Sequence, residues 1–153
     1  IYIVGFRSSS FLAGYLNFYF RLIYDNVTQV QGGAAGTFDQ LFRVGPGDVV
    51  IAICFPRYSE LALKTVQYAK DRGATIIGVT DSEMSPVYQM SSGSLLVRNE
   101  MISFVDSLAA PMSMLNALIL AAAHKQGTDI SATFNELEHV WDRFGIFGKV
   151  EDE

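Results

Sequence analysis

Five short runs rich in valine and isoleucine recur along this chain of 153 residues, and longer segments with helical patterns separate them. The runs are residues 1–5, 27–31, 49–54, 75–80 and 94–97. This spacing is typical of strand–helix units that build a parallel sheet. In the third and fourth runs the apolar residues do not alternate with polar ones, so both faces of those strands must be covered. The sequence therefore predicts an α/β fold with helices on both sides of the sheet.

Four further segments predict helices. Residues 60–72 have one apolar and one polar face, and Gly73 provides the C-terminal stop. Residues 11–24 carry apolar side chains in two stripes, which predicts a helix buried on more than one side, either by a second subunit in a homodimer or by another helix of the same chain. Residues 104–123 predict a buried helix with a polar start, and residues 130–144 a helix, capped by Asp129 or Ser131, whose apolar stripe belongs to a core or an interface. Residues 32–36 predict a loop.

Length, charge and cysteine content limit the possible functions. The length and the 50% hydrophobic content fit one compact domain, residues 1–153, and the strand-like start without Met suggests a piece of a longer polypeptide. The net charge of −5 argues against a nucleic-acid surface on this segment. Polar residues interrupt the most apolar window, which argues against a membrane span. The single cysteine, Cys54, cannot form an internal disulfide, so we expect a cytoplasmic protein.

The first of two polar turns follows the first predicted strand. It contains Arg7, Ser8, Ser9 and Ser10 after Gly5, a residue that permits a tight turn, and it leads into the helix at 11–24. The hydroxyl groups can donate hydrogen bonds, and the first N–H groups of a helix have no partners within the helix. Together these groups predict an anion-binding site.

The second polar turn follows the third predicted strand and contains Arg57, Tyr58 and Ser59. A structural role explains Ser59 as a helix N-cap and Glu60 as a first-turn acid. Arg57 gains nothing from the positive end of a helix unless an anion lies between them. We therefore expect Arg7 and Arg57 to converge on one anion; the alternative is that they pair with surface carboxylates.

Other candidates are weaker. Asp81 reads as a loop cap rather than a catalytic base, and Ser103, Asp106 or Ser107 could face the site or simply cap the following helix. The chain lacks the glycine-rich dinucleotide turn, the nucleotide-binding phosphate loop and the nucleophile elbow of hydrolases. Neither histidine lies in a ligand-spaced cluster, and Cys54 reads as a buried thiol. We therefore expect no metal and no cofactor.

The order and spacing of these segments resemble a known family. They are residues 3–10, 47–59, 69–74, 79–86 and 104–111, and the run Phe-Pro-Arg-Tyr-Ser at 55–59 is the most specific. The chain resembles a SIS domain, the sugar isomerase fold, and in particular the effector domain of RpiR-type bacterial transcriptional regulators. The resemblance implies a three-layer α/β/α sandwich with a five-stranded parallel sheet, usually dimeric, that binds a phosphosugar with its phosphate in the first and third strand-to-helix turns.

Residue by residue, Ser9 matches the serine of the family's first turn and Ser59 the threonine of its second. Arg7 and Arg57 replace glycines of that pattern, while Cys54 and Pro56 replace serines. These changes remove two hydroxyl donors and add two cations, so we expect the phosphate to be held more by charge than is usual in the family. The predicted ligand-binding set is Arg7, Ser8, Ser9, Ser10, Arg57, Tyr58, Ser59 and Ser107.

The resemblance favours a ligand-sensing module without catalytic activity. A phosphorylated sugar or related catabolite would bind between the two turns and shift a dimer that an upstream DNA-binding segment reads. An aldose–ketose isomerase needs a base, and the possible bases Glu60, Glu100 and His124 each have a structural interpretation at least as good. Isomerase activity, or a sugar-binding part of an amidotransferase or kinase regulator, remain the alternatives.

Overall fold

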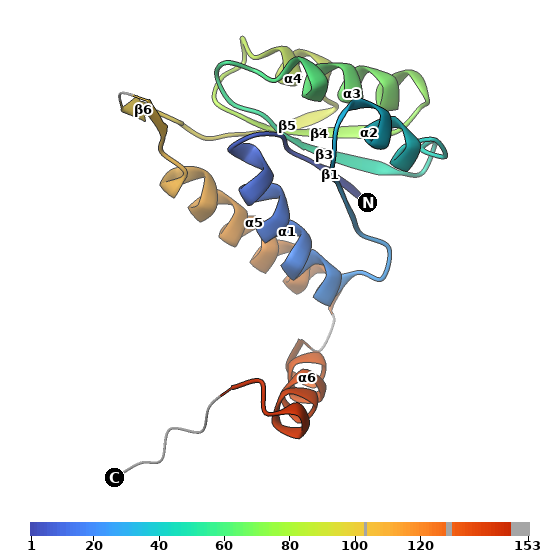
Figure 1. Ribbon diagram of the computed structural model, residues 1–153, viewed down its shortest axis with the longest axis vertical. Helices are drawn as coiled ribbons and strands as arrows, with labels where there is room; N and C mark the ends of the chain where they lie inside the picture. Colours follow the sequence, from blue (N-terminus) through green and yellow to red (C-terminus); the bar gives the residue numbers. More distant parts are fainter. Residues whose placement is uncertain (103, 128–129, 148–153) are drawn as a thin grey trace.

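The computed structural model describes residues 1–102, 104–127 and 130–147. Its centre is a five-stranded sheet in the order β2-β1-β3-β4-β5, in which every neighbouring pair is parallel (Figure 1). The strands are β1 (Tyr2–Val4), β2 (Thr28–Val30), β3 (Val49–Ile53), β4 (Thr75–Thr80) and β5 (Gly93–Leu96). All five predicted strands are confirmed, with ends that differ by no more than one residue.

Helices cover both faces of this sheet. On one face lie α1 (Ser9–Ile23) and α5 (Ala109–Gln126), and on the other lie α2 (Ala34–Gln40), α3 (Glu60–Asp71) and α4 (Pro86–Met90) (Figure 1). The predicted stop at Gly73 is confirmed, since its φ of 87° places it in the left-handed region just after α3. The three-layer α/β/α sandwich is therefore confirmed.

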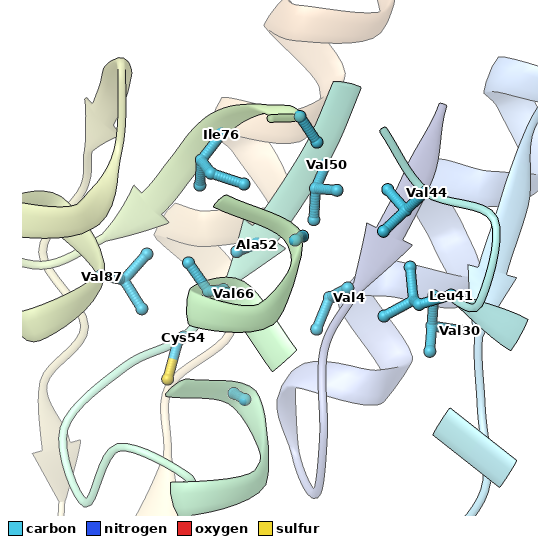
Figure 2. Packing of buried hydrophobic residues seen from close by; sticks show 13 residues of the cluster. Val4, Val30, Leu41, Val44, Val50, Ala52, Cys54, Val66, Ile76 and Val87 are labelled. Carbon is cyan, nitrogen blue, oxygen red and sulfur yellow. The ribbon is translucent and has the colours of Figure 1, made fainter. Parts of the chain in front are cut away.

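The central strand β3 shows why its sequence lacks polar alternation. Val50, Ala52 and Cys54 pack in one core cluster with Val66 of α3 and Val87 of α4 (Figure 2). The residues that alternate with them, Ile51, Ile53 and Phe55, pack in a second cluster with Leu12 and Leu16 of α1 and Leu115 of α5. Each face of the strand thus contributes to a separate core.

Two local predictions differ from the structure. The loop predicted at 32–36 is partly helical, because α2 begins at Ala34 after the extended Gly33. The helix predicted from residue 104 begins only at Ala109, because Val105–Asp106 forms β7, which pairs antiparallel with β6 (Met101–Ile102). Strands of two residues are too short to show a periodicity in sequence, so this hairpin had no detectable signal.

The last helix, α6 (Ile130–Phe144), lies apart from the sheet, beyond the end of α1 that is remote from the strands (Figure 1). Several of its apolar residues are exposed, among them Phe134, Val140 and Phe144. Its predicted cap Asp129 lies outside the described residues, and Ser131 lies within the helix rather than at its cap. None of the described helices is both long and apolar enough to span a membrane.

Candidate functional site

The strand order places the two polar turns side by side. β1 pairs with β2 on one side and with β3 on the other, and Val4 lies opposite Ala52 in the register of β1 and β3. The chain therefore leaves these two neighbouring strands in opposite directions, and a gap opens beyond their carboxyl ends. In open parallel sheets this switch in strand order is where ligands bind.

The first turn brings the start of α1 very close to the end of β1. A Cβ atom added to Gly5 would lie 2.5 Å from the carbonyl oxygen of Ser9 and 3.0 Å from the Cβ of Ala13, so glycine is required by the close approach of the helix. Arg7 has a φ of 56°, in the left-handed region that favours glycine. Ser8 is the residue before α1, and the buried Ser9 is the first residue of the helix.

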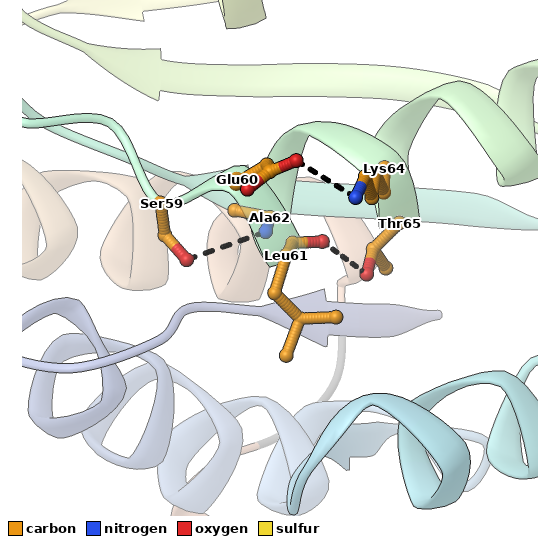
Figure 3. A network of polar contacts seen from close by, with 6 residues as sticks. All are labelled: Ser59, Glu60, Leu61, Ala62, Lys64 and Thr65. Atoms are coloured by element: carbon orange, nitrogen blue, oxygen red, sulfur yellow. Dashed lines mark hydrogen bonds and ion pairs between the residues drawn. The ribbon is translucent and has the colours of Figure 1, made fainter.

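The second turn repeats this geometry at the end of β3. Arg57 has a φ of 64°, so it too adopts a left-handed conformation. Ser59 is the N-cap of α3, as predicted, and its Oγ accepts a long hydrogen bond of 3.5 Å from the backbone N–H of Ala62 (Figure 3). An ion pair of 2.7 Å between Glu60 and Lys64 further supports the first turns of the helix.

Both turns line one pocket, and the N-terminal ends of α1 and α3 lie at it. The pocket is lined by Phe6, Arg7, Ser8, Ser9, Ile53, Cys54, Phe55, Pro56, Arg57, Ser59, Ala62 and Asp106. Two arginines and three serines thus come together from segments that are about fifty residues apart in sequence. This combination of cations, hydroxyl donors and positive helix ends can bind an anion.

Asp106 is the carboxylic acid among the described residues that line this pocket. One carboxylate oxygen, Oδ2, accepts a hydrogen bond of 2.7 Å from Ser8 Oγ, and the other, Oδ1, lies 3.5 Å from a terminal guanidinium nitrogen of Arg57. A single carboxylate therefore bridges the two turns. The sequence left open whether Asp106 faces the site or caps the following helix, and the structure places it in the pocket at the end of β7.

Three residues of the predicted binding set do not line this pocket. Ser10 donates a hydrogen bond of 2.6 Å to the Arg7 carbonyl and lines a neighbouring hollow with Gln29 and Gln31. The Tyr58 hydroxyl donates to Asp81 at 2.9 Å. The Ser107 backbone N–H donates to the Glu100 carbonyl at 3.2 Å, in the turn before α5.

Protonation of the side chains near the pocket follows from their surroundings. Burial raises the pKa of the Cys54 thiol above its usual value, so the thiol is neutral near neutral pH. Burial and the hydrogen bond to Asp81 raise the pKa of the Tyr58 hydroxyl. Asp81 accepts this hydrogen bond and another of 3.2 Å from the Thr80 hydroxyl. Within residues 1–102, 104–127 and 130–147 there is no group of ligating side chains that could hold a metal ion.

Comparison with known proteins decides the family. The family model of the SIS domain matches residues 1–121, which run from β1 into α5. The chain belongs to the SIS domain family. No curated protein sequence matches it significantly.

Solved structures share the fold of this SIS domain at low sequence identity. The sugar isomerase domain of an RpiR transcription factor from Sphaerobacter thermophilus is 20% identical, with a TM-score of 0.83 over 90% of this chain and 77% of the other. NanR of Vibrio vulnificus, solved in complex with ManNAc-6P, is 14% identical, with a TM-score of 0.77 over 97% of this chain and 56% of the other. The protein c3406 of E. coli CFT073 is 22% identical, with a TM-score of 0.74 over 90% of this chain and 75% of the other.

Proposed function

We propose that this SIS domain is the phosphosugar-sensing domain of an RpiR-type bacterial transcriptional regulator. The phosphate group binds in the pocket between the β1–α1 and β3–α3 turns, and the sugar extends from it toward solvent. Similarity to the RpiR domain and to NanR, a protein solved with a sugar phosphate, supports this proposal. DNA binding belongs to a separate upstream segment, in keeping with the net charge of −5 on this chain.

The observation that carries the proposal is the position of the two arginines. Both line the same pocket, and both adopt a left-handed backbone conformation that favours glycine and is unfavourable for arginine. Arg7 is exposed, and it forms no ion pair with any carboxylate of the described part of the chain. Two strained cations at one pocket are explained if an anionic ligand binds between them.

We propose a sensor rather than an enzyme because the pocket offers a poor acid–base group. Among its described lining residues Asp106 is the only carboxylic acid, and its two oxygens are engaged by Ser8 and Arg57. No glutamate or histidine is among these described lining residues. NMR of a bound sugar phosphate tests this point: its aldose and ketose forms should not interconvert, and turnover at a steady rate would favour the isomerase alternative.

Thermal unfolding with a panel of sugars tests the phosphate assignment. At a hundredfold excess of ligand over its Kd, a matching sugar phosphate should raise the Tm by roughly 5–10 °C. The corresponding free sugar should not raise the Tm, and Arg57→Ala or Ser59→Ala should abolish the shift. Arg43→Ala is the matched control, because Arg43 is an exposed arginine between α2 and β3 and does not line the pocket. Equal stabilisation by free and phosphorylated sugars would refute the assignment.

We also propose that the domain forms a homodimer through α1, together with α5. The sequence left open whether a second subunit or another helix of the same chain covers α1. The helix α5 covers part of α1, and Tyr15 donates a hydrogen bond to Asn116 of α5. The rest of this surface remains exposed: Phe11 is 72%, Phe18 57% and Leu120 of α5 70% accessible. Exposed apolar side chains on two adjacent helices are suited to packing against the same helices of a second copy.

Light scattering of the purified domain tests the dimer. The wild-type protein should be dimeric, and Phe18→Glu or Leu120→Glu should yield monomers, because a buried charge without a partner opposes association. Phe42→Glu is the matched control, since Phe42 is 69% exposed but lies in the turn after α2. A monomeric wild-type domain would contradict the proposal.

The coding sequence upstream of residue 1 tests the regulator role, and a bacterial transcriptional regulator acts in the cytoplasm. A helix-turn-helix segment encoded upstream of residue 1 would support the regulator, whereas an amidotransferase or kinase-regulator domain there would overturn it.

A further inference from the structure

The pocket already contains an anion that belongs to the chain. The Asp106 carboxylate uses one oxygen to accept the hydrogen bond from Ser8 in the first turn and the other to pair with Arg57 in the second. Its side chain is only 19% exposed, whereas that of Arg57 is 61% exposed. Asp106 thus lies on the inner side of the pair, against the pocket wall, and Arg57 lies at the rim.

These contacts are those that a ligand phosphate needs. The Ser8 hydroxyl can donate one hydrogen bond, and the Asp106 carboxylate accepts it. The Arg57 guanidinium is attracted to the same carboxylate. A phosphate that took both donors while Asp106 stayed in place would bring two anions into contact, which is electrostatically unfavourable. The carboxylate and the phosphate therefore compete for the single Ser8 proton and for the charge of Arg57.

We propose that Asp106 is a specificity-determining residue, a built-in competitor that only a doubly charged phosphate monoester displaces. This inference rests on the proposed phosphate site. A singly charged carboxylate ligand, such as a sugar acid, would merely repeat the contacts that Asp106 already makes, so the exchange brings no gain. A phosphate dianion has more charge and a third oxygen that can reach Arg7 or the N–H groups at the helix starts, so it replaces Asp106 with a net gain.

The sequence position of Asp106 makes displacement possible without disturbing the sheet. Asp106 is the last residue of β7, and β7 pairs only with β6 among the described strands. None of its contacts to Ser8 and Arg57 is part of the five-stranded sheet. The carboxylate can therefore leave the pocket while the two turns, which follow β1 and β3, keep their positions.

Calorimetric titration of Asp106→Asn with inorganic phosphate and with acetate tests the proposal, at mildly alkaline pH where phosphate is mainly dianionic. The wild-type domain should bind phosphate and show no heat with acetate. Removal of the competing charge should tighten phosphate binding by about tenfold or more and should make acetate binding measurable. Asp39→Asn is the control for the change in net charge, because Asp39 is an exposed acid on α2, and it should behave as wild type.

The outcomes separate this inference from the proposed function. Phosphate affinity that is unchanged or lower in Asp106→Asn, or acetate that still fails to bind, would overturn the competitor role. If Arg57→Ala leaves phosphate binding unaffected, the phosphate site itself is wrong. Asp106→Ser, which also removes the charge, is the second variant should Asp106→Asn fail to fold, and the same gain in phosphate affinity is expected.

Discussion

At the scale of single residues, the two arginines of the pocket are the most informative feature. Arg7 and Arg57 have φ values of 56° and 64°, and each comes from a turn that joins a strand to a helix. For a residue with a Cβ this conformation costs about 1–2 kcal/mol. A cost of this kind is typical of functional sites, where a particular side chain is needed at a strained position.

Two substitutions of Arg57 should separate its charge from its strain. Arg57→Gly removes both, whereas Arg57→Ala removes the charge but retains the unfavourable φ. We expect both variants to lose phosphate binding to the same degree. The glycine variant should have a free energy of unfolding about 1 kcal/mol higher than the alanine variant, because only glycine adopts this φ without a steric cost. Urea unfolding measures the difference, and equal stability of the two variants would argue against strain at this position.

The buried thiol of Cys54 gives a prediction about pH. Burial raises its pKa, so the folded state binds the thiol proton more tightly than the unfolded state does. The associated stability is complete below the ordinary thiol pKa and is lost as the pH rises through the higher folded value. Native Cys54 should accordingly react with iodoacetamide far more slowly than the urea-unfolded chain at the same pH. Mass spectrometry measures this rate, and equal rates would contradict the burial.

At the scale of secondary-structure elements, the contact between β1 and α1 depends on Gly5. A Cβ there would approach the Ser9 carbonyl oxygen to 2.5 Å, and backbone atoms cannot yield as a flexible side chain can. We expect Gly5→Ala to lower the free energy of unfolding by about 1–3 kcal/mol, as overpacking does, and to weaken phosphate binding by shifting the start of α1. Gly36→Ala is the control, because no atom lies within 4 Å of its added Cβ.

The sequence predicts the long elements of this fold better than the short ones. The runs at β3 and β4 are uninterrupted and apolar, and α3 has a clear cap at Ser59 and a stop at Gly73, so their positions follow from local chemistry. The helices α2 and α4 have seven and five residues, which is too short for a helical period to be visible. Their positions depend on packing against the sheet.

The residues of the candidate site likewise divide into those that local sequence predicts and those placed by distant contacts. Arg7, Ser8, Ser9, Arg57 and Ser59 belong to turns whose chemistry is local, and the sequence indicated all of them. The place of Asp106 depends on its contacts to Ser8 and Arg57, which lie 98 and 49 positions earlier in the chain. No local sequence pattern encodes these contacts. Tyr58 is the opposite case, because its place in the turn suggested a ligand contact while its hydroxyl donates to Asp81, which follows the end of β4.

At the scale of the whole molecule, α1 connects the pocket to the proposed dimer surface, and Asp106 of the pocket is followed closely by α5. α1 begins at Ser9 in the pocket and carries the exposed Phe11 and Phe18, and α5 begins three residues after Asp106 and carries Leu120. Ligand binding should therefore change the free energy of dimer association, and dimer association should change the free energy of ligand binding by the same amount. The apparent Kd for a sugar phosphate should change with protein concentration across the dimer–monomer range, and the Leu120→Glu variant should show no such change. A concentration-independent Kd in the wild-type domain would contradict this coupling.

The Ser8–Asp106 hydrogen bond also has a consequence for the order of folding. It joins two residues 98 positions apart, and contacts of such separation form late, because closing a long loop of chain is entropically costly. Both arginine turns lie within the first sixty residues, so their donors can be assembled before the carboxylate arrives. We expect each newly made molecule to pass through a stage in which the pocket accepts anions of any kind, and discrimination among them to be the last property that the folding chain acquires.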